Sequence, residues 1–283
     1  MNATPANISV ELVKAVENMP AFPKSAHRIL QLTRDAACAP KDLVAVIGND
    51  PVVTVKVLRV VNSAHYNLPK KITSIGHAVV FLGFNTIKNL SLSIAAVSML
   101  PSNPQTRFDG HAYLVHSLSV AGVARQIGLQ LQSGDPNDYF IAGLLHDFGK
   151  VVIAQGMPEV YKQAVEFSLW HEVSMHAALV SVAGIDHSLV GSMLLESWQF
   201  PADLVAAVRA QHSLSDQDGD LAYAVCAANQ ICKKLGVDFG GSPLEEAIPD
   251  CVVQRFGGKL NQVTADTQNL DLIVEEARRF ANL

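Results

Sequence analysis

The chain has 283 residues, a net charge of −5 at neutral pH and a hydrophobic fraction of 49%. This length suits one large domain or two packed subdomains, and the apolar content excludes a largely disordered chain. The mild negative charge argues against a nucleic-acid-binding protein, which needs a basic face. No basic segment leads into an apolar run near residue 1, and no apolar stretch is long enough to span a bilayer. We therefore expect a cytoplasmic protein without a signal peptide or membrane span.

Helical patterns fill nearly the whole first third of the sequence, and the dipeptides typical of β-hairpins are missing. Prolines and capping residues stand where helices should begin: Asp50 can cap a helix whose first residue is Pro51, and Ser74 can cap one that Gly83 ends. We expect helices from Ser9, from Pro23 to Asp35, from Pro40, from Pro51 to Asn62, from Ser74 to Leu82 and from Asn85 to Met99.

A linker follows, because residues 101–106 read Pro-Ser-Asn-Pro-Gln-Thr. We expect residues 1–100 to form an N-terminal helical subdomain and residues 107–283 to form a second helical subdomain with a C-terminal helical extension. Expected helices of the second part are 108–131, the segment around 141–153, 158–172, 175–182, 187–198, 201–211, 221–235 and 270–280. The fold class is therefore all-α.

The segment Ile141–Ile153 is apolar almost throughout, yet it carries His146, Asp147 and Lys150. An apolar helix of this kind should be buried, and a buried carboxylate is costly unless it is paired or bound to a metal. Three further histidines of the second subdomain lie on apolar faces or at helix ends: His116, His187 and His212. Imidazole and carboxylate together suit zinc, iron or manganese. We expect these four histidines and Asp147 to surround one shared divalent cation.

Each of these residues also has an ordinary explanation. A histidine on an apolar helix face is often a hydrogen-bonded core residue, and one in the last turn complements the helix dipole. His146 and Asp147 can form a buried hydrogen bond, with Lys150 as a surface charge. Two other histidines, His171 and His176, flank a helix break and are interpreted as surface or capping residues.

The order His116, His146-Asp147, His187 and His212 resembles the metal-binding pattern of the HD superfamily of metal-dependent phosphohydrolases, and Lys150 completes its His-Asp-x-Gly-Lys extension. Further features form an ordered set over roughly residues 10–235: Met19–Pro23, Ile47, Asp50-Pro51, Val57–Arg59, Asn62–Ala64, Tyr66, Ile72, Ser74-Ile75, Ala78, Leu82-Gly83, Gly184–His187, Gly191, Leu194-Leu195, Trp198, Phe200-Pro201 and His212. In this set the chain is similar to a more specific relative, the HDOD domain (HD-related output domain).

The resemblance implies an HD-type helical bundle preceded by an N-terminal helical subdomain, in a bacterial signal-transduction protein that acts as a regulatory binding or output module. Other signalling proteins are the expected partners, and a nucleotide is a candidate ligand. The alternative is a metal-dependent phosphohydrolase acting on a nucleotide or signalling nucleotide, in which Asp147 would be a ligand and Lys150 would stabilise developing charge. A purely structural helical protein is a third interpretation.

The chain departs from the active phosphodiesterases of the superfamily at two places. Asn229 stands where a later aspartate ligand is usual, and an uncharged amide oxygen is a weaker ligand. Ser213 follows His212, and the Gly-Tyr-Pro stretch of the HD-GYP enzymes is absent. Both departures favour the regulatory module over the enzyme.

Overall fold

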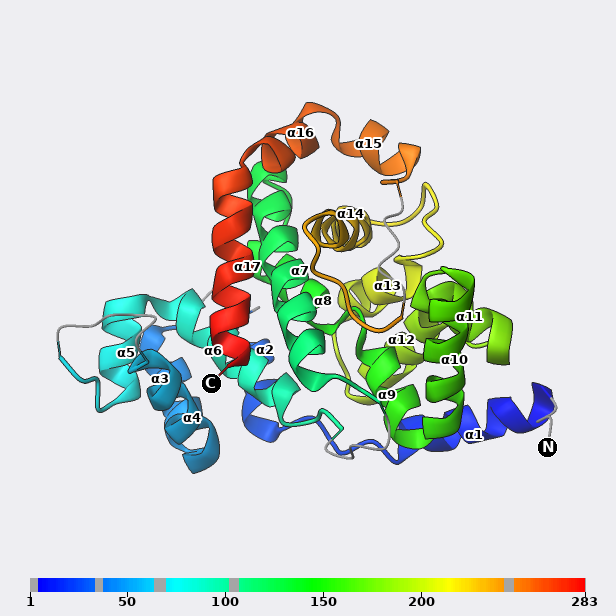
Figure 1. The fold of residues 1–283 in the computed structure, drawn as a ribbon. Helices are drawn as coiled ribbons and strands as arrows, with labels where there is room; N and C mark the ends of the chain where they lie inside the picture. The colour runs from blue at the N-terminus through cyan, green and yellow to red at the C-terminus, as the bar shows by residue number, and fades with distance from the viewer. Residues whose placement is uncertain (1–4, 34–37, 64–69, 102–106, 242–246, 283) are drawn as a thin grey trace. The chain divides into compact units, whose positions relative to one another are not determined.

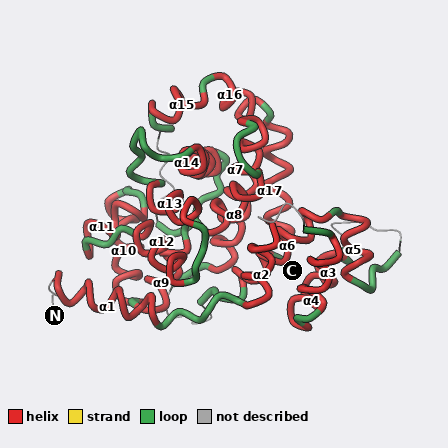
Figure 2. Tube along the Cα trace, turned by 180° about the vertical axis from the view of Figure 1, so that it is seen from behind, coloured by secondary structure: helices red, strands yellow, loops and turns green. Residues whose placement is uncertain are grey.

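The computed structural model describes residues 5–33, 38–63, 70–101, 107–241 and 247–282. Within these residues the chain forms helices and connecting loops, and no strand (Figures 1 and 2). The expected all-α class is confirmed. The chain divides into two compact units, a smaller one of residues 20–99 and 279–283 and a larger one of residues 1–19 and 100–278. Residues 102–106 of the expected linker lie outside the described residues.

The smaller unit contains the helices α2 Lys24–Thr33, α3 Pro40–Gly48, α4 Pro51–Val61, α5 Ile75–Leu82 and α6 Phe84–Val97. Its core is built from one side chain or more of each helix, and the fully buried members include Ile29, Leu43, Ile47, Val57 and Ile87. Aliphatic side chains at helical spacing thus form a packed interior, as the periodicity predicted.

Two polar residues of this unit hold the ends of α4. The Asp50 carboxylate accepts hydrogen bonds from the backbone N–H groups of Val52 and Val53, both at 3.1 Å. At the other end the Asn62 amide bonds both the N–H and the C=O of Ile72, each at 2.7 Å. The cap expected at Asp50 and the stop expected at Asn62 are confirmed.

Replacing Asp50 tests this cap. The Ser25 hydroxyl donates to the Asp50 carboxylate at 2.6 Å and, together with the helix N–H groups, holds the pKa of Asp50 below its usual 3.8. This stabilisation is present above the usual pKa and is lost as the pH falls through the lower value of the folded protein. Asp50→Ala should lower the free energy of unfolding by about 1 kcal/mol. Asp50→Asn should keep most of the cap and abolish its pH dependence. Urea unfolding between neutral pH and acid checks both, and an Asn variant that retained the pH dependence would contradict the assignment.

The larger unit contains the remaining helices: α1 Pro5–Glu17, α7 Gly110–Leu131, α8 Pro136–Leu145, α9 Phe148–Gly156, α10 Pro158–His171, α11 Met175–Ala183, α12 His187–Ser197, α13 Ala202–Ala210, α14 Asp220–Lys234, α15 Asp250–Phe256, α16 Gly258–Ala265 and most of α17 Thr267–Ala281. The long helix α7 packs against α8 and α14, while α9 packs against α12 and α1 (Figure 1). These packed helices carry or flank the candidate ligands His116, His146, Asp147 and His187.

Several helix boundaries differ from expectation. Helix α1 begins at Pro5, so Ser9 lies inside it and the cap expected there is wrong. Helix α6 begins at Phe84 after Gly83, rather than after a cap at Asn85. Helices α15 and α16 fall between the expected helices 221–235 and 270–280, in a segment for which we made no prediction.

Among the described residues, no single helix is both long enough and apolar enough to cross a bilayer. One pair, α11 with α12, is long and apolar enough jointly but is bent by 91° at its break.

Candidate metal centre

The His-Asp doublet lies at a break between two helices, and the single helix expected around residues 141–153 is wrong. Helix α8 ends at Leu145, and His146 and Asp147 occupy the junction before α9. The Gln211 amide donates to the His146 carbonyl at 2.7 Å, and the Lys150 N–H bonds the Asp147 carbonyl at 2.9 Å instead. A continuous helix would have joined Lys150 N–H to His146. The break lets two adjacent side chains reach the same site.

His116, His146 and Asp147 meet there, and we call these three residues the inner cluster. The His116 and His146 Nε2 atoms are 3.3 Å apart. The Asp147 Oδ2 atom lies 3.5 Å from His116 Nε2 and 3.4 Å from His146 Nε2. All three residues are 0% exposed. His116 thus lies beside the doublet, and its role as a metal ligand stays a prediction.

Backbone carbonyls determine which ring nitrogens carry hydrogen. His116 Nδ1 lies 3.0 Å from the Val237 carbonyl, and His146 Nδ1 lies 2.7 Å from the Gly143 carbonyl. A carbonyl can only accept, so each Nδ1 is the donor, and a ring that carries its single hydrogen there turns an Nε2 lone pair into the cluster. Burial lowers the pKa of His146 to about 3, which keeps that ring neutral. Two nitrogen lone pairs and a carboxylate oxygen therefore face one another.

Two imidazole nitrogens and a carboxylate oxygen that face one another are a ligand set that suits a divalent transition metal. Ligands about 2.0–2.1 Å from a tetrahedral zinc ion stand about 3.3–3.4 Å from each other. The three separations in the inner cluster, 3.3, 3.4 and 3.5 Å, are of this size. The carbonyl partners of the two Nδ1 atoms are the outer hydrogen bonds that orient histidines around metals in proteins. The inner cluster could hold a divalent transition metal with little rearrangement.

Lys150 supplies one positive charge beside the cluster. Its ammonium donates to Asp147 Oδ2 at 2.7 Å, and the side chain is 7% exposed, so the interpretation of Lys150 as a surface charge is wrong. Burial alone would raise the pKa of Asp147, but the Lys150 ammonium beside it holds that pKa well below its usual range. Asp147 is therefore a carboxylate.

The other two predicted ligands, His187 and His212, lie on the side of Asp147 that carries its other oxygen, Oδ1. His187 Nε2 lies 3.1 Å from Asp147 Oδ1, and His212 Nε2 lies 3.3 Å from His187 Nε2. Burial lowers the pKa of both imidazoles. The five predicted residues thus lie in one connected set, but His187 and His212 are separated from the inner cluster by Asp147 instead of surrounding one common point with it.

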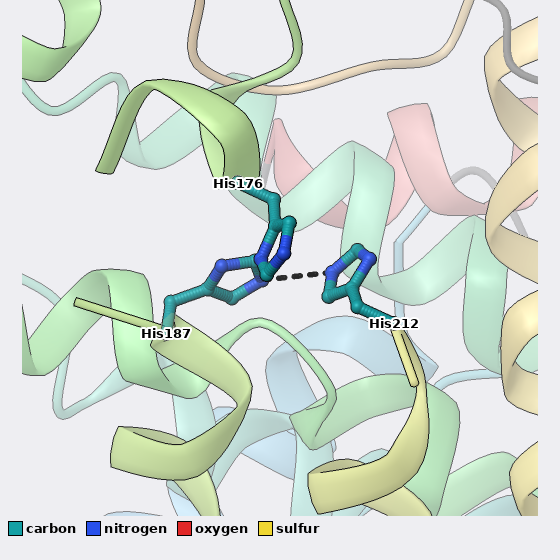
Figure 3. A group of neighbouring side chains, drawn as sticks. All are labelled: His176, His187 and His212. Atoms are coloured by element: carbon teal, nitrogen blue, oxygen red, sulfur yellow. Dashed lines mark hydrogen bonds between the residues drawn. The ribbon is translucent and has the colours of Figure 1, made fainter. Parts of the chain in front are cut away.

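A sixth residue, His176, joins this second group, and the sequence analysis missed it. Its ring stacks on His212, with centroids 4.1 Å apart and planes 17° apart, and it meets the His187 ring edge-on (Figure 3). We call His176, His187 and His212 the outer cluster; one ligand atom from each lies within 4.8 Å of the others. His176 lies one residue inside α11, beyond the Ser174 cap, and no spacing in the sequence links that helix start to His212.

Asn229 is a buried residue of the larger unit. Whether its side-chain oxygen can replace the usual aspartate ligand stays a prediction. It lies on α14, which packs against α7 and α13, and it is 5% exposed. Its side-chain oxygen has no hydrogen-bond partner among the described residues.

Comparison with known proteins assigns the family. The model of the HDOD domain matches residues 19–214, which include every residue of the inner and outer clusters. The chain belongs to the HDOD domain family. This confirms the resemblance inferred from the sequence.

Solved structures share the fold along nearly the whole chain. An HDOD domain protein of unknown function from Geobacter sulfurreducens is 22% identical with a TM-score of 0.77, and 97% of this chain and 98% of that one are covered. A protein from Marinobacter aquaeolei, provisionally named a signal transduction protein, is 21% identical with a TM-score of 0.78, over 99% of this chain and 67% of that one. A protein from Shewanella amazonensis, provisionally named a phosphohydrolase, is 22% identical with a TM-score of 0.69, over 96% and 97%.

Among curated proteins, an uncharacterized protein of Treponema pallidum is 25% identical over 254 residues. The match covers 88% of this chain and 48% of the relative, so the HDOD chain spans about half the length of that protein.

Proposed function

We propose that this HDOD chain is a regulatory binding module whose larger unit is organised around a bound divalent transition metal, with zinc, iron or manganese as candidates. The burial of the inner cluster carries the proposal, because His116, His146 and Asp147 are 0% exposed. A catalytic metal needs a position that water or substrate can reach. Residues that are 0% exposed hold an ion out of reach of a substrate in solution, which favours an ion that stabilises the fold over one that acts on a substrate.

The inner cluster would join elements that are distant in the sequence. His116 comes from the middle of α7, and His146 and Asp147 come from the junction of α8 and α9. The Val237 carbonyl adds the segment after α14 through its bond to His116. Because metal affinity for folded ligands adds to the free energy of folding, a bound ion would stabilise this arrangement. A regulatory module of this kind acts through partner proteins. The structurally similar Marinobacter protein is named a signal transduction protein, which supports other signalling proteins as the partners.

A second candidate function is a metal-dependent phosphohydrolase acting on a nucleotide. The partial exposure of His176 and His212 favours it, because a small substrate could approach the outer cluster from solvent. A metal ion would supply polarisation of a phosphoryl oxygen. Asp147 would hold the ion, and the Lys150 ammonium, which lies 2.7 Å from Asp147 Oδ2, would balance negative charge. Asn229 in place of an aspartate weighs against this function.

Hydrolysis assays separate the two functions. The tag-free chain, loaded in turn with zinc, manganese or iron(II), is offered nucleoside triphosphates, cyclic mononucleotides and cyclic dinucleotides. We expect no turnover that depends on Asp147. Turnover that disappears in Asp147→Ala and persists in Asp216→Ala, a matched change of an exposed loop aspartate, would contradict the regulatory module.

A further inference from the structure

We infer that residues 236–241, at the start of the loop that leaves α14, form a gate over the inner cluster, which must lift before a metal ion can reach or leave that site. We call this segment the strap. The inference deepens the proposed function and rests on it, since it concerns access to the same site. Phe239 is the positioning residue that holds the strap shut.

The strap lies directly on a residue of the inner cluster. Its Val237 carbonyl accepts the hydrogen bond from His116 Nδ1 at 3.0 Å, and Val237 is 4% exposed. Figure 1 shows the loop that leaves α14. The other partners of the cluster side chains, Gly143, Lys150 and His187, belong to helices. A residue inside a packed helix is held by the hydrogen bonds of that helix, whereas a loop can open by itself. The strap is therefore the part of this wall that can move separately.

Phe239 fastens the strap through its ring. The residue is 3% exposed, and its ring centroid lies 4.9 Å from that of Phe108 and 5.2 Å from that of Tyr113, with planes 62° and 83° apart. Aromatic pairs in edge-to-face geometry attract each other. The Lys150 ammonium, which donates to Asp147, lies 5.8 Å from the centre of the Phe239 ring, within the range of a cation–π contact. One side chain thus joins the strap both to α7 and to the charge beside the inner cluster.

Glycines at both ends allow the strap to move. Gly236 and Gly240 have φ angles of 70°, and Gly241 has one of 93°, a left-handed region that glycine adopts readily. At the far end the backbone lies so close to α10 that a Cβ added to Gly241 would overlap the Ser168 hydroxyl. Residues 238–241 make no backbone hydrogen bond within the described part of the chain. A segment with glycine ends and few backbone bonds can open without unfolding the helices around it.

The kinetics of metal binding test the gate. The tag-free chain, stripped of metal, is mixed with excess cobalt(II), and binding is followed by the visible absorption bands of the bound ion. The phase that is missing in Asp147→Ala reports the inner cluster. If the strap must open first, the observed rate rises with cobalt concentration to a plateau set by the rate of opening. Phe239→Ala should raise this plateau about tenfold or more, because the ring contacts no longer hold the strap down. Release of cobalt to excess EDTA should accelerate as well.

Two further variants separate a gate from a weakened site. Phe239→Leu keeps a buried apolar side chain and should raise the plateau by a smaller factor, so the test does not depend on the alanine variant folding. Phe256→Ala, a matched change of a buried phenylalanine on α15, should leave the plateau unchanged. A variant that only weakened the ligands would release cobalt faster but bind it no faster.

The failures of the gate and of the metal site can be told apart. A wild-type binding rate that increases linearly with cobalt concentration, or a plateau that neither Phe239 variant changes, would overturn the gate and leave the inner site intact. The absence of any binding phase that depends on Asp147 would overturn the metal site and the gate together.

Discussion

Asp147→Ala is expected to abolish metal binding by the inner cluster and to lower the free energy of unfolding of the metal-free chain by about 3–5 kcal/mol. The carboxylate is 0% exposed and is contacted by Lys150, His116, His146 and His187. Its removal leaves the Lys150 ammonium buried without a counter-charge, and an uncompensated buried charge is strongly destabilising. Urea unfolding and metal analysis of the same preparation measure both effects.

A double variant identifies the cause of the lost stability. Adding Lys150→Met to Asp147→Ala removes the unpaired ammonium, so part of the stability should return while metal binding stays absent. Asp216→Ala, at an exposed loop position, should change neither quantity. A loss below about 1 kcal/mol, the range of exposed ion pairs, or full metal content in Asp147→Ala would contradict the role given to this carboxylate.

Gly149→Ala is expected to destabilise the larger unit by about 3 kcal/mol or more and to weaken metal binding. Helices α9 and α12 approach each other so closely at Gly149 that an added Cβ would overlap the His187 carbonyl oxygen and lie 2.8 Å from the Gly191 nitrogen. Backbone atoms of a packed helix cannot move aside as a flexible side chain can. The two helices must separate, and Asp147 then moves away from His187.

Gly76→Ala is the matched control for this substitution. Gly76 lies inside α5, and an added Cβ there would meet nothing within 4 Å. Because alanine is the better helix former, this variant should be as stable as the wild type or more stable by up to about 1 kcal/mol. Thermal unfolding and zinc titration compare the two. Equal stability and equal zinc affinity in both variants would contradict the close helix crossing.

Much of the helical organisation could be predicted because helix boundaries depend on local chemistry. A carboxylate followed by proline, as at Asp50-Pro51, begins a helix through bonds within four residues of it. Asp186 likewise begins the helix that starts at His187, because its carboxylate accepts a hydrogen bond from the Ser188 N–H. The cap expected at Ser9 failed because the helix extends through it from Pro5, where no side-chain signal stands out.

The candidate site could be predicted only in part, because its decisive contacts join distant residues. An apolar segment containing His146 and Asp147 signalled a buried polar site. The helix break at that doublet depends on Gln211, which is 65 residues away, and the orientation of His116 depends on Val237, 121 residues away. His176 had no sequence signal, since only packing brings the start of α11 to the end of α13 (Figure 3).

Crystals of the tag-free chain loaded with zinc, measured on both sides of the zinc absorption edge, test the central claim most directly. The account predicts an anomalous difference peak between His116 Nε2, His146 Nε2 and Asp147 Oδ2, with no other protein donor needed to explain its position. Fully loaded crystals with no peak among these three atoms, and with Lys150 still bonded to Asp147, would contradict it.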